Sequence, residues 1–218
     1  VGSDLVWAVA PVPDVAAIVR LEQGGDRENF LSLGRLFRFY KDNAVVTVFR
    51  NCPFTNRVTV AGSLSIVSEN GAVVSLADET GFVLPAGTGL SISNVVLDGR
   101  GTAKVKGQFF AVNGGALTLE RGASVRGITC TGGGNMGGAI LLQSGELTMR
   151  PGSEIRGCRA EGDGCGGPCR GPAARLQQMG LRASHSSRCR WRGEDGDDDR
   201  RTGELDVSRD GRHGQRSC

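Results

Sequence analysis

The stretch Gly115-Ala-Leu-Thr-Leu-Glu-Arg-Gly-Ala-Ser-Val-Arg-Gly127 returns later in the chain as Gly145-Glu-Leu-Thr-Met-Arg-Pro-Gly-Ser-Glu-Ile-Arg-Gly157. The apolar-hydroxyl-apolar triplet at its centre occurs four times at nearly constant spacing along the sequence. A spacing of this size is typical of a supersecondary unit that buries its apolar face by stacking on copies of itself, so the sequence predicts a solenoid. The four triplets are Leu64-Ser65-Ile66, Leu90-Ser91-Ile92, Leu117-Thr118-Leu119 and Leu147-Thr148-Met149.

The spacing inside each triplet predicts strands rather than helices. Its two apolar residues lie two apart, which puts them on one face of a strand and the hydroxyl residue on the other. In the long repeat, a glycine corner and a second short strand around Val125 or Ile155 follow the triplet. A third strand is predicted before each triplet, at residues 57–60, 82–84, 109–112 and 139–142. Three strands per repeat predict an all-β fold, a parallel β-helix of about four coils over residues 57–164.

Three segments carry a resemblance to a known family: Phe110-Ala-Val-Asn-Gly-Gly115, Gly137-Gly-Ala-Ile-Leu-Leu142 and Leu90-Ser-Ile-Ser-Asn-Val-Val-Leu-Asp-Gly99. They resemble the right-handed parallel β-helix repeats of large bacterial surface and secreted proteins, which share the pectin-lyase-like fold. The resemblance covers residues 15–164 and implies a right-handed, single-stranded β-helix located outside the cell or on its surface. Adhesins, polysaccharide lyases and inert stalks share these motifs, so the resemblance implies a fold more narrowly than an activity.

Residues 15–56 are predicted to form the N-terminal cap of the solenoid, after a leader or linker at residues 1–14. Residues 16–21 predict a strand, and apolar residues at helical spacing over residues 30–41 predict a short amphipathic helix. An open solenoid end exposes apolar side chains and unpaired strand edges, and we expect this helix to cover them. Residues 44–49 are predicted to be the first strand of the stack.

The composition changes abruptly after Gly164. Residues 165–218 hold 11 Arg, no Lys, no Ile and no Phe. Such a segment buries too little apolar area to offset the entropy of ordering it, so we predict a disordered tail. Two hypotheses for its origin stay open. One is a native basic appendage that attracts polyanions, and the other is a shift of reading frame near Asp163 in a G+C-rich gene, at the point where the next strand of a coil is expected.

A column of hydroxyl groups follows from the predicted stacking. If the triplets lie in register, Ser65, Ser91, Thr118 and Thr148 point outward along one face, spaced by about 4.8 Å, the distance between neighbouring strands. These four residues are the candidate binding residues of the chain, and a glycan or another cell-surface ligand is the expected partner. An ordered water layer and plain solvent exposure are the two alternatives for the same column.

The acidic residues of the body do not predict catalysis. Glycoside cleavage needs two carboxylates within reach of one bond, whereas the acids of residues 1–164 are scattered and this part of the chain contains no His. Asp78 and Glu79, together with Asp98, are the one group that folding could bring together as a cation site, and solvated loop charges are the preferred interpretation. We therefore expect a non-catalytic, adhesin-like scaffold; the alternative is a non-catalytic or degraded part of a polysaccharide lyase or glycoside hydrolase.

Charge and cysteine content limit the expected partners. Residues 1–164 contain 15 basic and 15 acidic side chains, which gives no electrostatic reason to bind nucleic acid. No stretch approaches 18 apolar residues, so we expect no membrane span. Cys158 aligns with Ile128 of the preceding repeat, so we expect it to be a small buried side chain. The spacing of Cys158, Cys165 and Cys169 is not that of a zinc site. We expect a monomeric fragment of a longer exported protein, without metal or cofactor.

Overall fold

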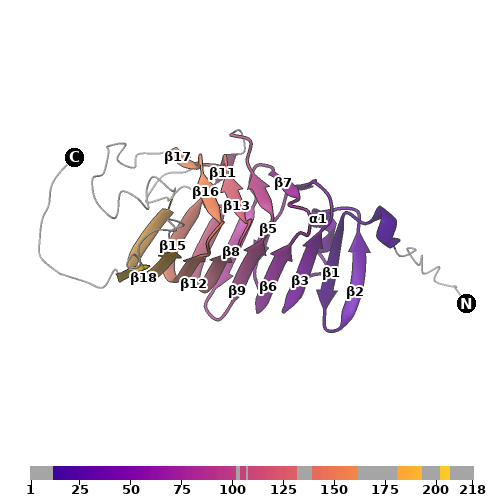
Figure 1. Cartoon of the computed structure of the whole chain (residues 1–218), viewed down its shortest axis with the longest axis horizontal. Helices are drawn as coiled ribbons and strands as arrows, with labels where there is room; N and C mark the ends of the chain where they lie inside the picture. The colour runs from indigo at the N-terminus through magenta and orange to yellow at the C-terminus, as the bar shows by residue number, and fades with distance from the viewer. Residues whose placement is uncertain are drawn as a thin grey trace, which may run out of the picture.

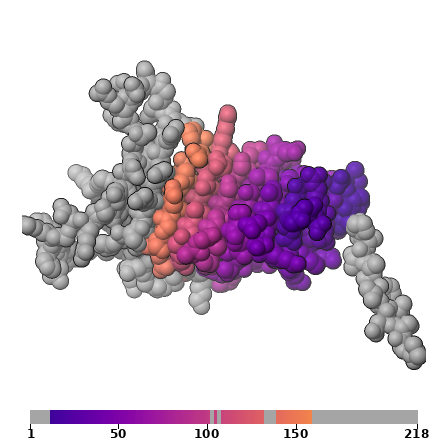
Figure 2. All heavy atoms as spheres, turned by 90° about the horizontal axis from the view of Figure 1, so that it is seen from below, coloured from indigo at the N-terminus to yellow at the C-terminus, as the bar shows by residue number. Residues whose placement is uncertain are grey.

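The computed structural model describes residues 12–101, 104–106, 108–131, 139–161, 181–192 and 202–206. These residues form an all-β solenoid of about three turns with very little helix. The strands lie side by side along the long axis (Figure 1), and successive stretches of the chain follow one another as bands along the molecule (Figure 2). The solenoid therefore has about three turns, where the sequence predicted about four coils.

The first side of the solenoid carries the triplets, in parallel strands whose register is the one predicted. Leu90 lies opposite both Leu64 and Leu117, and Leu117 lies opposite Leu147. The repeat alignment is therefore confirmed residue by residue. This first side consists of β3 (Ala44–Val48), β6 (Ser63–Val67), β9 (Gly89–Ser93) and the C-terminal halves of β12 (Phe110–Leu119) and β15 (Ile140–Met149).

Two further sides close each turn, as three strands per repeat predicted. The second side is a five-stranded parallel sheet, and the third side contains the strand that precedes each triplet. A small extra sheet, which the sequence did not predict, follows the second side. The second side consists of β4 (Cys52–Phe54), β7 (Val73–Leu76), β10 (Val96–Asp98), β13 (Ser124–Arg126) and β16 (Glu154–Arg156); the third of β5 (Arg57–Thr59), β8 (Gly81–Pro85) and the N-terminal halves of β12 and β15; and the extra sheet of β11 (Lys104–Lys106), β14 (Thr129–Thr131) and β17 (Arg159–Glu161).

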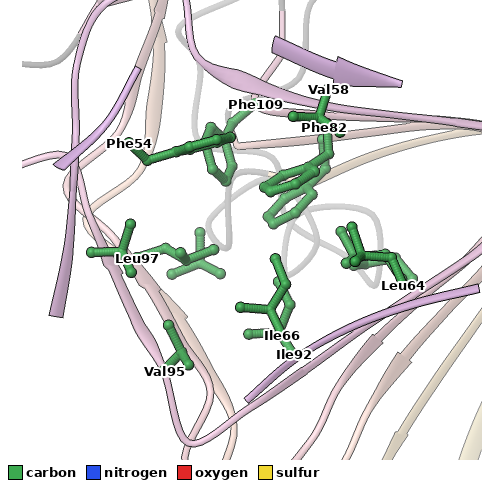
Figure 3. Packing of buried hydrophobic residues seen from close by; sticks show 14 of the residues in the cluster. Phe54, Val58, Leu64, Ile66, Phe82, Ile92, Val95, Leu97 and Phe109 are labelled. Carbon is green, nitrogen blue, oxygen red and sulfur yellow. The ribbon is translucent and has the colours of Figure 1, made fainter. Parts of the chain in front are cut away.

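The apolar residues of the triplets fill the interior, as alternation along the strands requires. Seven of the eight are at most 2% exposed, and Met149 is partly buried against the same core. In Figure 3, Leu64, Ile66 and Ile92 come from the first side, and they face Val95 at the corner before β10, Leu97 from the second side, and Val58 and Phe82 from the third. The buried triplet residues are Leu64, Ile66, Leu90, Ile92, Leu117, Leu119 and Leu147.

A column of phenylalanine rings runs through the interior. The Phe82 ring stacks on Phe54 at 5.1 Å and on Phe110 at 5.8 Å between centroids, with interplanar angles of 18° and 15°. Phe109 meets Phe82 and Phe110 edge to face. At the N-terminal end, Phe37 packs on Phe54 at 5.5 Å. One continuous aromatic column therefore links the N-terminal cap to the third turn.

The N-terminal cap is built mainly from strands, which corrects the predicted helix over residues 30–41. β1 (Val19–Gln23) and β2 (Asp26–Phe30) form a hairpin, and β1 pairs with β3 in the antiparallel direction. The helix α1 has only four residues (Leu33–Leu36), with Ser32 as its N-cap, after a 3-10 turn (Asp14–Ala16) earlier in the chain. The apolar spacing fits a continuous helix, but Phe30 belongs to strand β2, and only Leu33 and Leu36 belong to the helical turn; all three are buried. These helical residues still cover the core at this end, as expected.

The predicted tail contains two described strands. β18 (Leu181–Arg192) extends the stack by pairing in parallel with β15, and β19 (Thr202–Asp206) pairs antiparallel with β18. Within these two stretches the structure differs from the expected disorder, because an open strand edge is completed by backbone hydrogen bonds that need no apolar side chain. The remaining residues of 165–218, and residues 1–11 of the predicted leader, lie outside the described residues.

Candidate binding face

The four predicted hydroxyl residues form one column on the outside of the first side. Ser65 lies opposite Ser91, Ser91 opposite Thr118, and Thr118 opposite Thr148, each in a neighbouring turn. All four side chains are half-buried and alternate with buried or partly buried apolar residues. We call Ser65, Ser91, Thr118 and Thr148 the hydroxyl column. Their alignment is the one that the repeat predicted, whereas their role in binding remains a prediction.

The surface beside the hydroxyl column is made of small side chains. On β6 and β9 the other outward positions are Ser63, Val67, Gly89 and Ser93, none of which carries a charge. On β12 and β15 this face also carries charged side chains, where Arg150 approaches Glu120 at 3.8 Å and the Thr148 hydroxyl donates to Glu146 at 3.2 Å. The first two turns therefore present a neutral surface from which no long side chain projects.

The predicted carboxylate group, Asp78, Glu79 and Asp98, does not form a cation site. Oδ1 of Asp78 accepts a hydrogen bond from the Lys104 amide at 2.7 Å, which ties one turn to the next. Asp98 accepts from the Arg100 amide and pairs with the Arg126 guanidinium. In the described part of the chain, no three His, Cys, Asp or Glu side chains gather so that they could hold a metal ion. The carboxylates of Asp78 and Asp98 are therefore engaged in hydrogen bonds that join separate segments of the chain.

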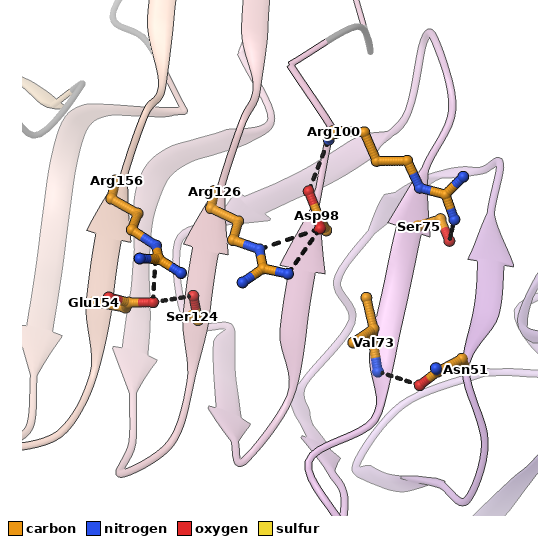
Figure 4. Close-up of polar contacts among 9 residues, drawn as sticks. All are labelled: Asn51, Val73, Ser75, Asp98, Arg100, Ser124, Arg126, Glu154 and Arg156. Atoms are coloured by element: carbon orange, nitrogen blue, oxygen red, sulfur yellow. Dashed lines mark hydrogen bonds and ion pairs between the residues drawn. The ribbon is translucent and has the colours of Figure 1, made fainter.

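The second side carries a polar network that the sequence did not predict. Arg126 donates to Asp98 through Nε at 3.1 Å and Nη2 at 2.9 Å. The Ser124 hydroxyl donates to Glu154 at 2.7 Å, and Arg156 pairs with the same carboxylate at 3.2 Å. Figure 4 shows the Arg126–Asp98 and Ser124–Glu154 contacts crossing from strand to strand, whereas Arg156 and Glu154 lie on the same strand, β16. The one feature of the sequence that could have indicated these pairs is their separation along the chain, which is close to the length of one repeat.

The carboxyl group of Asp98 is stabilised in its charged form. Partial burial raises the pKa of Asp98, but hydrogen bonds from the Arg100 amide and Arg126, together with the charges of both arginines, outweigh this and leave the pKa below its ordinary value. A lowered pKa in the folded state favours folding at every pH above the unfolded value of about 3.9. This contribution is lost as the pH falls through the lower folded value.

Replacing Asp98 by Asn tests this contribution. We expect the free energy of unfolding at pH 7 to fall by about 1 kcal/mol or less, because the ion pair is partly exposed to solvent. The difference between wild type and Asp98→Asn should shrink as the pH drops below about 3.9, where the Asp98 carboxyl of the unfolded chain becomes protonated while that of the folded chain stays charged down to its lower pKa. Urea unfolding at pH 7, 5 and 3 measures it. A difference in unfolding free energy that widens toward pH 3 would contradict the lowered pKa of Asp98 in the folded protein.

Cys52, Cys130 and Cys158 are free thiols whose pKa values are raised by burial. Burial raises the pKa of Cys52 and of Cys130 to about 11, so both stay protonated at neutral pH. Cys158 is half-buried and packs against the core, and burial raises its pKa as well. A thiol with a raised pKa is a poor nucleophile and metal ligand. Cys165 and Cys169, the other members of the zinc pattern considered above, lie outside the described residues.

Comparison with protein-family models, with curated proteins and with solved structures gave no match to this chain. The class of fold is therefore defined by the strand order and register alone, as a β-solenoid. No helix within the described ranges is both long enough and apolar enough to cross a bilayer.

Proposed function

We propose that this chain is a non-catalytic scaffold segment of an extracellular or cell-surface protein. In this role the solenoid holds the hydroxyl column in a fixed position and presents it to a glycan or another cell-surface ligand. The observation that carries the proposal is the in-register alignment of the column on a face with no charged side chain in its first two turns.

The state of the carboxylates also favours a scaffold over an enzyme. A general acid or nucleophile has to reach substrate, whereas Asp78 and Asp98 are hydrogen-bonded to backbone amides and, for Asp98, to a guanidinium. A carboxyl group that serves as general acid has a raised pKa, whereas that of Asp98 is lowered. The finer assignment to the adhesin-like members of the pectin-lyase-like fold rests on the sequence resemblance over residues 15–164.

An assay for cleavage tests the absence of catalysis. The full chain is incubated with polygalacturonate and with neutral polysaccharides, with and without added calcium, and the solution is analysed for new unsaturated or reducing ends. We expect none, because Asp78 and Asp98 are engaged by backbone amides and, for Asp98, by a guanidinium. Product formation that Asp78→Ala or Asp98→Ala abolishes would show that the chain is an enzyme.

Substitutions in the hydroxyl column test the proposed binding. In affinity electrophoresis through gels that contain a polysaccharide, Ser91→Ala and Thr118→Ala should each weaken retention, by about threefold to tenfold for one lost hydrogen bond. Unfolding free energies should stay nearly unchanged, because both side chains face outward. Thr59→Ala is the matched control, since Thr59 is an exposed strand residue on the third side. Equal retention of all three variants and the wild type would leave the column without a binding role.

A further inference from the structure

Two Asn-Gly pairs occur in the described residues, and their asparagine side chains differ in their hydrogen bonds. They are Asn70-Gly71, at a corner between the first and second sides, and Asn113-Gly114, at the corner inside β12 between the third and first sides. Both asparagines are exposed, and both glycines have positive φ, 72° and 100°. Sequence and exposure alone therefore do not distinguish the two pairs.

The side chain of Asn70 is held at both ends. Its Oδ1 accepts a hydrogen bond from the Ser68 hydroxyl at 2.8 Å, and its Nδ2 donates to the Phe49 carbonyl at 2.8 Å. These contacts fix the amide between two turns of the chain. Rotating the amide carbon of Asn70 toward the Gly71 nitrogen would break both of them.

The side chain of Asn113 has no hydrogen bond to any other described residue. Its backbone also leaves the regular ladder, because the register shifts on both sides of Asn113 opposite β15 and between Asn113 and Gly114 opposite β8. Irregular pairing of this kind frees a strand locally from the constraints of the sheet. Of the two exposed Asn-Gly pairs, Asn113-Gly114 is therefore the one whose asparagine side chain is not held by hydrogen bonds to described residues and whose backbone pairing is irregular.

We infer that Asn113-Gly114 is a site of spontaneous deamidation in the folded protein and that Asn70-Gly71 is protected. In this step the Gly114 nitrogen attacks Cγ of Asn113, a new N–C bond forms, and the side-chain amide leaves as ammonia. Water then opens the resulting cyclic imide at either carbonyl and leaves an aspartate or an isoaspartate. Glycine at the second position lets the attack proceed because no side chain stands in its path.

Deamidation at Asn113 would change the charge and the backbone of the corner inside β12. Each event adds a negative charge at residue 113, and an isoaspartate also lengthens the main chain by one carbon. A Cβ placed on Gly114 would already meet Ala86 at 2.9 Å, so the corner has little room for a changed backbone. Ageing of the protein is thus expected to weaken the junction between β12 and the preceding turn.

Incubating the full chain at pH 8.5 and 37 °C, followed by tryptic peptide mass spectrometry, tests the inference. Deamidation is detected by the mass shift from amide to acid, and isoaspartate is detected with isoaspartyl methyltransferase. Both products should appear at Asn113 about tenfold faster than at Asn70, because two hydrogen bonds hold the Asn70 side chain. In concentrated urea the two rates should become similar. Asn113→Gln should remove the signal at residue 113, because glutamine closes the corresponding ring far more slowly.

The wild-type comparison stands even where the variant fails to fold, because Asn70 is an internal control. Equal rates at the two sites in the folded chain, a faster rate at Asn70, or no modification at Asn113 would each overturn the inference. A ratio that persists unchanged in urea would also overturn it, since the difference would then come from local sequence and not from the fold.

Discussion

Replacing Phe82 by Ala is expected to lower the free energy of unfolding by about 3 to 5 kcal/mol. The Phe82 ring is 1% exposed and lies between the rings of Phe54 and Phe110, with Phe37 and Phe109 at its edges. Its removal leaves a cavity in the middle of a narrow core, where neighbouring turns are fixed by backbone pairing and cannot move in to fill it. Denaturant unfolding followed by far-ultraviolet circular dichroism measures the loss.

Phe39→Ala is the matched control for this substitution. The Phe39 side chain is 46% exposed and contacts one aromatic ring, that of Phe30 at 5.5 Å. Its removal should cost at most about 1.5 kcal/mol. Equal losses for Phe82→Ala and Phe39→Ala would show that the aromatic column does not stabilise the stack as its geometry indicates.

Replacing Gly145 by Ala is expected to destabilise the protein by at least about 2 kcal/mol. Gly145 lies at the corner where β15 passes from the third side to the first, with a φ of 98° that residues with a side chain rarely adopt. A Cβ there would also overlap the carbonyl oxygen of Gly115 in the preceding turn. The substitution therefore strains the backbone and pushes β15 away from β12.

Gly89→Ala provides the comparison within the same sheet. Gly89 begins β9, its φ is outside the left-handed region, and no atom lies within 4 Å of the position that a Cβ would take. This substitution should change the unfolding free energy little, or raise it by up to about 1 kcal/mol by restricting the unfolded chain. Similar stabilities for Gly145→Ala and Gly89→Ala would contradict the close approach of the two turns at Gly145.

The repeat register could be predicted because it depends on local patterns. Alternation of apolar and hydroxyl residues marks a strand, and glycine marks the corners, so aligning the copies placed Leu90 beside Leu64 and Leu117 before any contact was known. The hydroxyl column followed from the same alignment. The N-terminal cap was harder, because apolar residues at positions 30, 33 and 36 fit a helix as well as a strand followed by one helical turn.

The polar network of the second side could not be predicted in detail. Asp98 and Arg126 are 28 residues apart along the chain, which equals none of the three spacings between successive triplets. A pairing of this kind depends on the length of each corner, and the extra sheet of β11, β14 and β17 shows that the corners differ between turns. Side-chain partners across turns are therefore fixed by the completed fold.

The register of the four triplets is the claim on which both the fold and the hydroxyl column depend. Nuclear Overhauser contacts between backbone protons of the isotopically labelled full chain test it directly. We predict contacts that link Ser65 to Ser91, Ser91 to Thr118 and Thr118 to Thr148, as parallel strands in this register require. Contacts displaced by one residue would contradict the account, because a shift of one turns the hydroxyls inward and the leucines toward solvent.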